Sequence, residues 1–266
     1  MFTFNDVLAA RKNARAFSGV FDLLNRVEYR RIETSEEKEE VLRFRYNCYR
    51  NSGYIDENPD RICTDSFDSA PNVSTFCVYE EGKLLSSIRV HYVDQDNTAS
   101  PGVLCYPEIL NPLLERGVRF VDSSRFTIDQ DVRAIQGSLH FITLRLPILA
   151  CVYHDVDYSL SVIRPAHGAF YKRFFSFDTW GEVRDYPGLH FQIQLYAGHI
   201  ASVSKPTLKR LPFMASMESE RKLLFSREES RKACFVARPS AEFALNRLLS
   251  SVEVPADVAA AAEQVA

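Results

Sequence analysis

The chain has 266 residues, of which 46% are apolar, and its formal net charge at pH 7 is −3. This composition can bury the core of one large domain or of one domain with appendages, and the small net charge excludes a globally basic, nucleic-acid-binding protein. No run of 18 apolar residues is present and the N-terminus lacks the apolar stretch of a signal peptide, so we expect a soluble, cytoplasmic protein.

The N-terminal segment from Phe2 to Leu24 has apolar residues at spacings of three and four, which predicts an amphipathic helix. Its expected solvent-facing side carries Arg11, Lys12 and Arg15. Packing on the domain usually stabilises such a helix, although a lid or a helix on a membrane surface has the same pattern. We therefore expect residues 1–25 to form an N-terminal helix, with peripheral membrane contact as an alternative role.

A short strand over Glu28–Glu33 precedes a helix for which Thr34 is the expected capping residue. Arg45 and Tyr49 stand four residues apart and so share one face of this helix. The following loop, Ser52–Asn72, is rich in aspartate and aromatic residues. Loops of this length without secondary structure of their own are usually functional or disordered, and the composition favours an ordered loop.

Beyond this loop the sequence alternates between strands and helices. The expected elements are a hairpin over Thr75–Tyr79 and Leu84–Tyr92, a helix over Tyr106–Glu115, a strand over Arg119–Ile128, a helix over Ser138–His154, a strand over Tyr158–Ile163, a helix from Arg164, and strands over Thr179–Glu182 and His190–Ala197. This order predicts an α/β fold over residues 26–203, with a mixed sheet covered by helices on both faces.

The C-terminal residues 204–266 are predicted to form a basic, helical extension. Helices are expected over Met214–Lys232 and Ala241–Val252, followed by a frayed tail. The six cysteines form no C-x-x-C pair, and no Cys/His cluster has zinc spacing. We therefore expect free thiols in a reducing compartment and no metal site.

The strand over Arg119–Ile128 carries two charges, Asp122 and Arg125. A strand through the middle of a domain seldom carries charges unless they are paired or required for function. From this stretch alone, the two charges could form a buried structural ion pair or lie at the edge of an active site, and both interpretations remain open.

The order of elements, with Arg164-Pro-x-His-x-x-Phe-Tyr-Lys-Arg-Phe near its end, resembles the Gcn5-related N-acetyltransferase (GNAT) fold. The finer resemblance is to acyl-homoserine-lactone synthases and their relatives, the N-acyl amino acid synthases. The matching positions are Arg45 and Tyr49, Tyr54, Asp65-Ser-Phe-Asp68, Arg89, and Asp122-Ser-Ser-Arg125-Phe126. The resemblance implies a GNAT-like acyltransferase domain, and the helices predicted from the sequence at the N- and C-terminal ends are additions to it.

Two departures from the lactone synthases favour N-acyl amino acid synthesis. Asp122 stands where those enzymes have Glu, and Tyr54 where they have Trp. In addition, Gln130–Gly137 has a single glycine in place of the glycine-rich pyrophosphate loop of GNAT enzymes. We therefore expect acyl-acyl carrier protein, rather than acyl-coenzyme A, as the acyl donor, and no resident cofactor.

The resemblance implies that the chain joins a long acyl group to the amino group of an amino acid. The attacking amine must lose a proton, and Asp122, Asp65 and Asp68 are the candidate bases, with Arg125 as a further catalytic residue. The candidate substrate-binding residues are Arg45, Tyr49, Tyr54, Arg89 and Phe126, with Arg89 or Arg125 suited to the carboxylate of the amino acid. By the same resemblance, these acids and arginines also hold the loop over the site.

An acyl chain requires an apolar tunnel, for which Phe141, Leu144 and Ile148 are the candidates, although a plain core helix is the commoner explanation of such residues. Basic residues between Lys205 and Lys232, with Arg164, Lys172 and Arg173, would dock an acidic carrier protein. The alternatives are an acyl-homoserine-lactone synthase, a coenzyme-A-dependent GNAT enzyme acting on a small amine, and a non-catalytic lipid- or partner-binding module.

Overall fold

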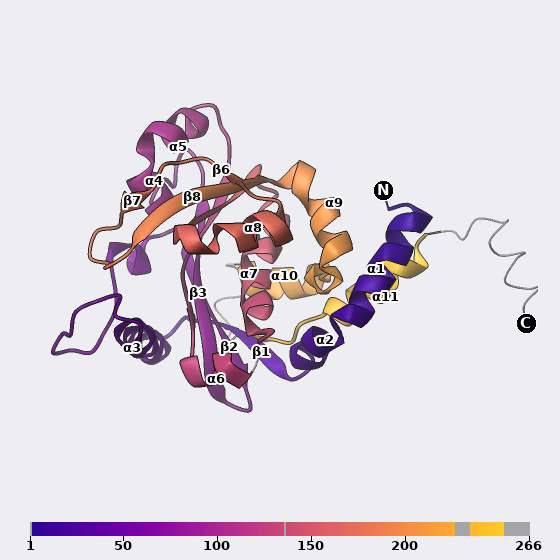
Figure 1. The fold of residues 1–266 in the computed structure, drawn as a ribbon, viewed down its shortest axis with the longest axis horizontal. Helices are drawn as coiled ribbons and strands as arrows, with labels where there is room; N and C mark the ends of the chain where they lie inside the picture. Colours follow the sequence, from indigo (N-terminus) through magenta and orange to yellow (C-terminus); the bar gives the residue numbers. More distant parts are fainter. Residues whose placement is uncertain (1, 136, 227–234, 253–266) are drawn as a thin grey trace, which may run out of the picture.

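A computed structural model describes residues 2–135, 137–226 and 235–252 of the chain (Figure 1). Its strands are β1 (Val27–Arg31), β2 (Val73–Glu80), β3 (Lys83–Val93), β4 (Phe120–Ile128), β5 (Tyr158–Ile163), β6 (Asp178–Thr179), β7 (Arg184–Asp185), β8 (Gln192–His199) and β9 (Phe235–Ala237). They form one nine-stranded sheet in the order β6-β8-β5-β4-β3-β2-β1-β9, with β7 pairing beside β8.

The described α-helices are α1 (Phe4–Ala16), α2 (Ser18–Leu24), α3 (Ser35–Asn51), α4 (Pro101–Cys105), α5 (Pro107–Leu114), α6 (Gln130–Ile135), α7 (Leu139–His154), α8 (Gly168–Phe175), α9 (Ile200–Arg210), α10 (Glu218–Phe225) and α11 (Ala241–Ser250). Short 3₁₀ turns lie at η1 (Ser66–Ser69), η2 (Pro165–His167) and η3 (Pro212–Met214). No described helix has the length and apolar character needed to cross a membrane.

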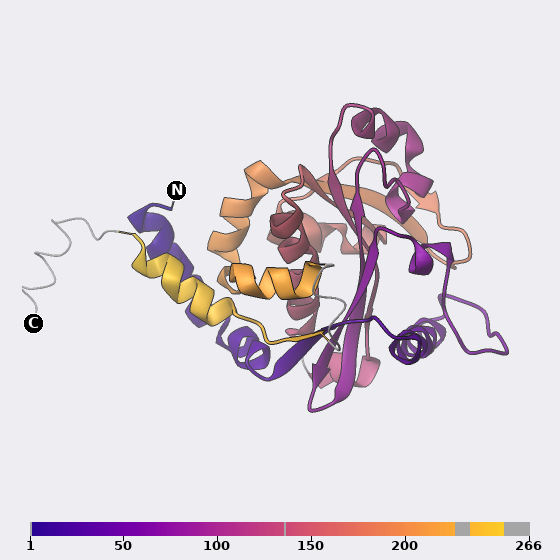
Figure 2. The ribbon, with the colours of Figure 1, turned by 180° about the vertical axis from the view of Figure 1, so that it is seen from behind.

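The sheet is mixed, as the sequence predicts. β4 and β5 run parallel, joined by α7, while the other pairs along the sheet are antiparallel. Figures 1 and 2 show α7 and α10 on one face of the sheet and α3 on the other. The predicted mixed α/β fold with helices on both faces of the sheet is therefore confirmed.

Local sequence signals explain several of these elements. Thr34 caps α3 through a capping box with Glu37, which satisfies backbone N–H groups at the start of the helix. The hairpin of β2 and β3 turns at Glu81 and Gly82, which both have positive φ angles, of 50° and 80°. A two-residue turn in which both residues have positive φ angles matches the right-handed twist of the paired strands.

The N-terminal segment differs from the single helix that its periodicity predicts. The chain breaks at Phe17 and forms two helices, α1 and α2. The Phe17 ring packs edge-on against Phe141 and Phe213, at centroid distances of 5.7 and 5.2 Å. The break thus packs a half-buried aromatic ring against the main core, a contact between distant segments that helical periodicity does not reveal.

The C-terminal extension packs on the sheet and its helices. β9, which is not expected from the sequence, pairs antiparallel with β1 at the sheet edge. Arg145 of α7 and Glu220 of α10 form a buried ion pair, with exposed side-chain fractions of 0% and 2%. Of the helix expected over Met214–Lys232, the structure describes α10 only, and the expected frayed tail after Val252 lies outside the described residues.

Candidate active site

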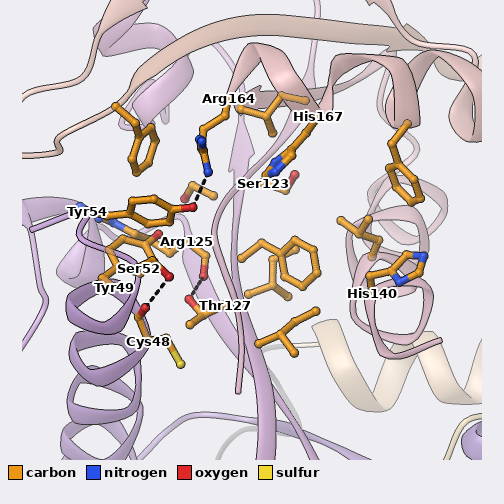
Figure 3. Close-up of a pocket in the computed structure, with 18 of the residues that line it drawn as sticks. Cys48, Tyr49, Ser52, Tyr54, Ser123, Arg125, Thr127, His140, Arg164 and His167 are labelled. Carbon is orange, nitrogen blue, oxygen red and sulfur yellow. Dashed lines mark hydrogen bonds between the residues drawn. The ribbon is translucent and has the colours of Figure 1, made fainter. Parts of the chain in front are cut away.

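The candidate site is a cavity that opens where β4 and β5 part (Figure 3). The two strands pair only as far as Ser123 and Ser161, although β4 continues to Ile128 and β5 to Ile163. The cavity has a volume of about 580 Å³, within the range of about 300–1,000 Å³ that small-molecule sites occupy. Backbone groups on the β5 side of β4 therefore face this space instead of a strand.

One wall of the cavity is mainly apolar. It is formed by the sheet residues Ile88 and Phe126, by Leu144 of α7, and by Phe170 and Tyr171 of α8. Such a wall suits a fatty acyl chain, because apolar surface buried against it leaves water.

The opposite wall is polar and aromatic, and it comes from the end of α3, the loop after it, and β4. Figure 3 shows Tyr49, Tyr54 and Arg125 on this side, across the cavity from His140 of α7. The Tyr54 ring packs edge-on against Phe191 at a centroid distance of 4.9 Å. The cavity thus separates an apolar side from a side that can bind polar groups.

A bulge in β4 directs Arg125 to the polar wall. Ser87 pairs with Thr127 and Arg89 with Ser124, so Arg125 and Phe126 together stand opposite the single residue between Ser87 and Arg89. Arg125 has a φ angle of 52°. A left-handed conformation costs a residue with a side chain on the order of 1 kcal/mol, and here it places Arg125 and Ser124 on the same side of the sheet.

Three arginines and two aspartates hold the loop after α3 against the sheet. Arg45 binds both carboxylate oxygens of Asp68, at 3.0 and 2.9 Å. Arg89 binds Asp65 at 2.5 and 3.1 Å and Asp68 at 2.9 Å. Arg125 donates to Asp65 at 2.6 Å. We call these five residues the arginine–aspartate cluster.

The two aspartates of this cluster are held as carboxylates. Burial alone raises the pKa of Asp65, but the hydrogen bonds and charges of Arg89 and Arg125 outweigh it and hold the pKa below its usual range. For Asp68, burial is likewise outweighed by the charges of Arg45 and Arg89, so its pKa is also lowered. Carboxylates with lowered pKa are weak bases, and these two orient arginines and the loop.

Asp122 lies outside the cavity, beneath α4. Its side chain is fully buried, and its Oδ2 accepts a hydrogen bond of 2.7 Å from the backbone N–H of Gly102. A Cβ atom at Gly102 would lie 2.9 Å from Oδ2, so a glycine is required at this close approach. Burial raises the pKa of Asp122 to about 6, although the Gly102 hydrogen bond opposes the rise. This pKa suits a base, but no cavity surface reaches the carboxyl group.

His91 lies directly opposite Asp122 in the ladder between β3 and β4, and it is also fully buried. Its ring packs edge-on against Phe67, with the centroids 5.8 Å apart. Burial, together with the charge of Arg89, lowers the pKa of His91 to about 4, so its imidazole is neutral at pH 7.

An acid occupies the start of the helix that follows β4. The Asp129 side chain accepts hydrogen bonds from the backbone N–H groups of Asp131 and Val132, at 2.9 and 3.2 Å. Asp131 adds a second acid to the first turn of α6. Amides that are already bound to a carboxylate cannot cradle a pyrophosphate, and the two acids repel one.

The structure separates the candidate residues into three groups. The cavity is lined by Tyr49, Tyr54, Arg125, Phe126 and Leu144. Arg45, Asp65, Asp68 and Arg89 lie behind its polar wall, in the arginine–aspartate cluster. Asp122, Phe141 and Ile148 are not among the lining residues; the two apolar side chains pack with the main core.

Other residues of the cavity were not assigned to the site from the sequence. Arg164, which the sequence assigns to a docking surface, lines the cavity, as do His140, His167 and Phe191. The Arg-Pro-x-His sequence directly after β5 is the signal that could have placed Arg164 and His167 here, since strand ends border the gap between β4 and β5. No group of three or more His, Cys, Asp and Glu residues with metal-binding geometry occurs in the described part of the chain.

A family model shows the family of the chain, and solved structures show its fold. A family model described as N-acyl amino acid synthase FeeM matches residues 40–199, more than half of the chain. The solved structure of FeeM, an N-acyl amino acid synthase from uncultured soil microbes, is similar with a TM-score of 0.57 and 19% identity, over 70% of this chain and 97% of that one.

Two homoserine-lactone synthases are also similar in structure. The AHL synthase LasI has a TM-score of 0.52 and 15% identity, over 70% of this chain and 94% of its own. BjaI, a coenzyme-A-dependent acyl-homoserine lactone synthase, has a TM-score of 0.50 and 13% identity, over 70% of this chain and 90% of its own. A search of curated proteins gives no significant match.

Proposed function

The chain belongs to the FeeM family of N-acyl amino acid synthases and is therefore an N-acyltransferase, and on that premise we propose its donor and acceptor. The proposed donor is a long-chain acyl group on acyl carrier protein, and the proposed acceptor is the amino group of an amino acid. The observation that carries this proposal is the cavity between β4 and β5, which sets an apolar wall opposite a polar one.

The proposed reaction is an acyl transfer from sulfur to nitrogen. The neutral amine attacks the thioester carbonyl, a C–N bond forms, the C–S bond breaks, and the carrier thiol leaves with a proton. Backbone N–H groups of β4 beyond Ser123, which have lost β5 as a partner, would stabilise the oxyanion. The acyl chain would lie along Phe126, Leu144 and Phe170 on the apolar wall.

The amino acid carries an ammonium group at neutral pH, so it must lose a proton before the neutral amine can attack. A group that faces the cavity has to accept this proton, directly or through water. Asp65 and Asp68 have lowered pKa values, and Asp122 is enclosed beneath α4. We assign the base to a histidine of the cavity, His140 or His167, because histidine changes charge near neutral pH. The proposed role of the three aspartates is to hold Arg125, the loop and β4 in position.

Two observations favour acyl carrier protein over coenzyme A as the donor. Asp129 and Asp131 place acids at the start of α6, where a pyrophosphate would need free backbone amides. Lys172 and Arg173 are exposed on α8, the helix that also supplies cavity residues, and would attract an acidic carrier. Lys205, by contrast, forms an ion pair with Asp6, so its charge is partly neutralised.

A thiol-release assay tests the donor and the acceptor together. Purified protein is incubated with acyl carrier protein loaded with chains of about 12 to 16 carbons, and each of the twenty amino acids is added in turn. We expect at least one amino acid to release free carrier thiol. Release only from acyl-coenzyme A with another small amine would overturn the proposal in favour of the alternative activity.

A further inference from the structure

The polar wall of the cavity contains a cation that the arginine–aspartate cluster does not include. Arg164 follows β5 directly, and its Nη1 donates a hydrogen bond to the hydroxyl group of Tyr54. Its guanidinium carbon lies 5.0 Å from the centre of the Tyr54 ring and 5.8 Å from that of Phe191. Figure 3 shows the Arg164 side chain directed into the cavity, towards Tyr54 and above Arg125.

The charge of Arg164 is available to a ligand. Arg45, Arg89 and Arg125 each bind one or two aspartates, and Arg89 is fully buried and also donates to Ser124. Within the described residues Arg164 forms no ion pair, and Tyr54 is its hydrogen-bonding partner. A guanidinium has five N–H donors, so several remain for an anion.

We propose that Arg164, oriented by Tyr54, binds the carboxylate of the acceptor, and that the enzyme thereby selects amines that carry a carboxylate. This inference rests on the proposed function. A guanidinium matches a carboxylate with two parallel hydrogen bonds, and flanking aromatic rings lower the local dielectric and strengthen them. Arg164 lies across the cavity from the apolar wall, on the side that the acyl chain leaves free.

Two anions share this chemistry: the carboxylate of the acceptor and the phosphate of the carrier's prosthetic group. Arg164 holds the carboxylate if its loss affects the acceptor alone, and the phosphate if its loss affects the donor. The two sources are therefore separated by steady-state kinetics in which each substrate is varied while the other is saturating.

The first experiment compares wild type with Arg164→Met, using an accepted amino acid and its carboxamide, which lacks the charge. We expect wild type to prefer the amino acid by about 10- to 100-fold in kcat/KM, and Arg164→Met to reduce that preference to about one. The KM of the acyl donor should stay unchanged. Arg247→Met, on the exposed face of the distant α11, is the matched control and should retain the wild-type preference.

A preference that persists in Arg164→Met would overturn the inference, as would a rise in donor KM without a change in acceptor preference, which would assign Arg164 to the phosphate. Arg164→Lys provides a second variant if the methionine variant fails to fold. Lysine keeps the charge but loses the two-pronged geometry, so the preference should fall to an intermediate value.

Calorimetric binding of N-dodecanoylglycine and its methyl ester gives a readout that does not require turnover. Wild type should bind the acid more tightly than the ester by about 10-fold or more, and Arg164→Met should bind the two equally. If wild type acylates no amino acid but still shows this difference, the proposed function fails while the carboxylate site stands. Equal binding of acid and ester by wild type removes the site itself.

Discussion

Nη2 of Arg125 lies 2.6 Å from Oδ2 of Asp65, and this contact joins the central strand β4 to the loop that follows α3. Asp65 also binds Arg89, so a single carboxylate holds two guanidiniums at the back of the polar wall. The site depends on this carboxylate for its shape, because the loop that carries Asp65 also carries Tyr54.

Replacing Asp65 with Asn should therefore damage both stability and activity. Arg89 and Arg125, whose side chains are 0% and 7% exposed, would lose their shared counter-charge. We expect the free energy of unfolding to fall by about 2–4 kcal/mol and kcat/KM by more than about 10-fold. Urea denaturation and the thiol-release assay measure the two effects.

The matched control for Asp65→Asn is Glu39→Gln, which breaks the exposed pair between Glu39 and Arg43. Exposed pairs contribute little, so this change should stay within about 0.5 kcal/mol of wild type. Equal effects of the two substitutions would show that the arginine–aspartate cluster has no special structural role.

Asp122→Asn should show a stability effect that depends on pH. The folded protein binds the Asp122 proton more tightly than the unfolded chain, so this residue costs stability as the pH rises from 3.8 to about 6. Asparagine removes that cost. Between pH 4 and pH 7, the free energy of unfolding of the variant should therefore rise by about 1–3 kcal/mol relative to that of wild type, as measured by urea denaturation.

The same variant tests whether Asp122 is the base. With Asp122 enclosed beneath α4, Asp122→Asn should leave the acidic limb of the pH–rate profile in place, whereas replacement of the histidine proposed as the base, His140 or His167, should remove it. A profile whose acidic limb disappears in Asp122→Asn would return the role of base to this aspartate.

Glu220→Gln should destabilise the chain far more than Glu218→Gln on the same helix. Glu220 is buried against Arg145 and also accepts a hydrogen bond from Ser240, so its loss leaves a buried guanidinium without its counter-charge. We expect a loss of about 3–5 kcal/mol. Glu218 forms an exposed pair with Lys222, so Glu218→Gln should keep the wild-type urea midpoint. Equal urea midpoints for the two variants would contradict the claim that the C-terminal extension is part of the folded core.

Leu144→Trp should shorten the acyl chains that the enzyme accepts. Leu144 is the tunnel candidate that lines the cavity, and a larger side chain there removes space along the apolar wall. Ile148→Val, on the same helix but outside the cavity lining, is the control and should leave the preference unchanged. Donors with chains of graded length measure the preference, and an unaltered profile in Leu144→Trp would exclude this wall as the chain-binding surface.

Much of the fold could be predicted because its signals are local. The cap at Thr34, the alternating pattern of β5 and the apolar run of α7 each specify an element within a few turns or strand residues. The pairing of β9 with β1 and the break at Phe17 could not be predicted this way. Both arise from contacts between segments far apart in the chain.

The residues around the site were also predicted in part. The resemblance selected Asp65, Asp68, Arg89 and Arg125, and the structure brings these together. The resemblance could not show that Asp122 lies outside the cavity, because this position depends on the close approach of Gly102 of α4 to the carboxyl group. The left-handed φ angle of Arg125 could not be predicted from the sequence either, because arginine has no preference for this conformation.

Mass spectrometry of lipid extracts tests the central claim most directly. Cells that express the wild-type chain should contain an N-acyl amino acid that is absent from cells expressing Asp65→Asn at a matched level of folded protein. An extract without any such lipid, or with an acyl-homoserine lactone in its place, would contradict the claim that this enzyme acylates an amino acid.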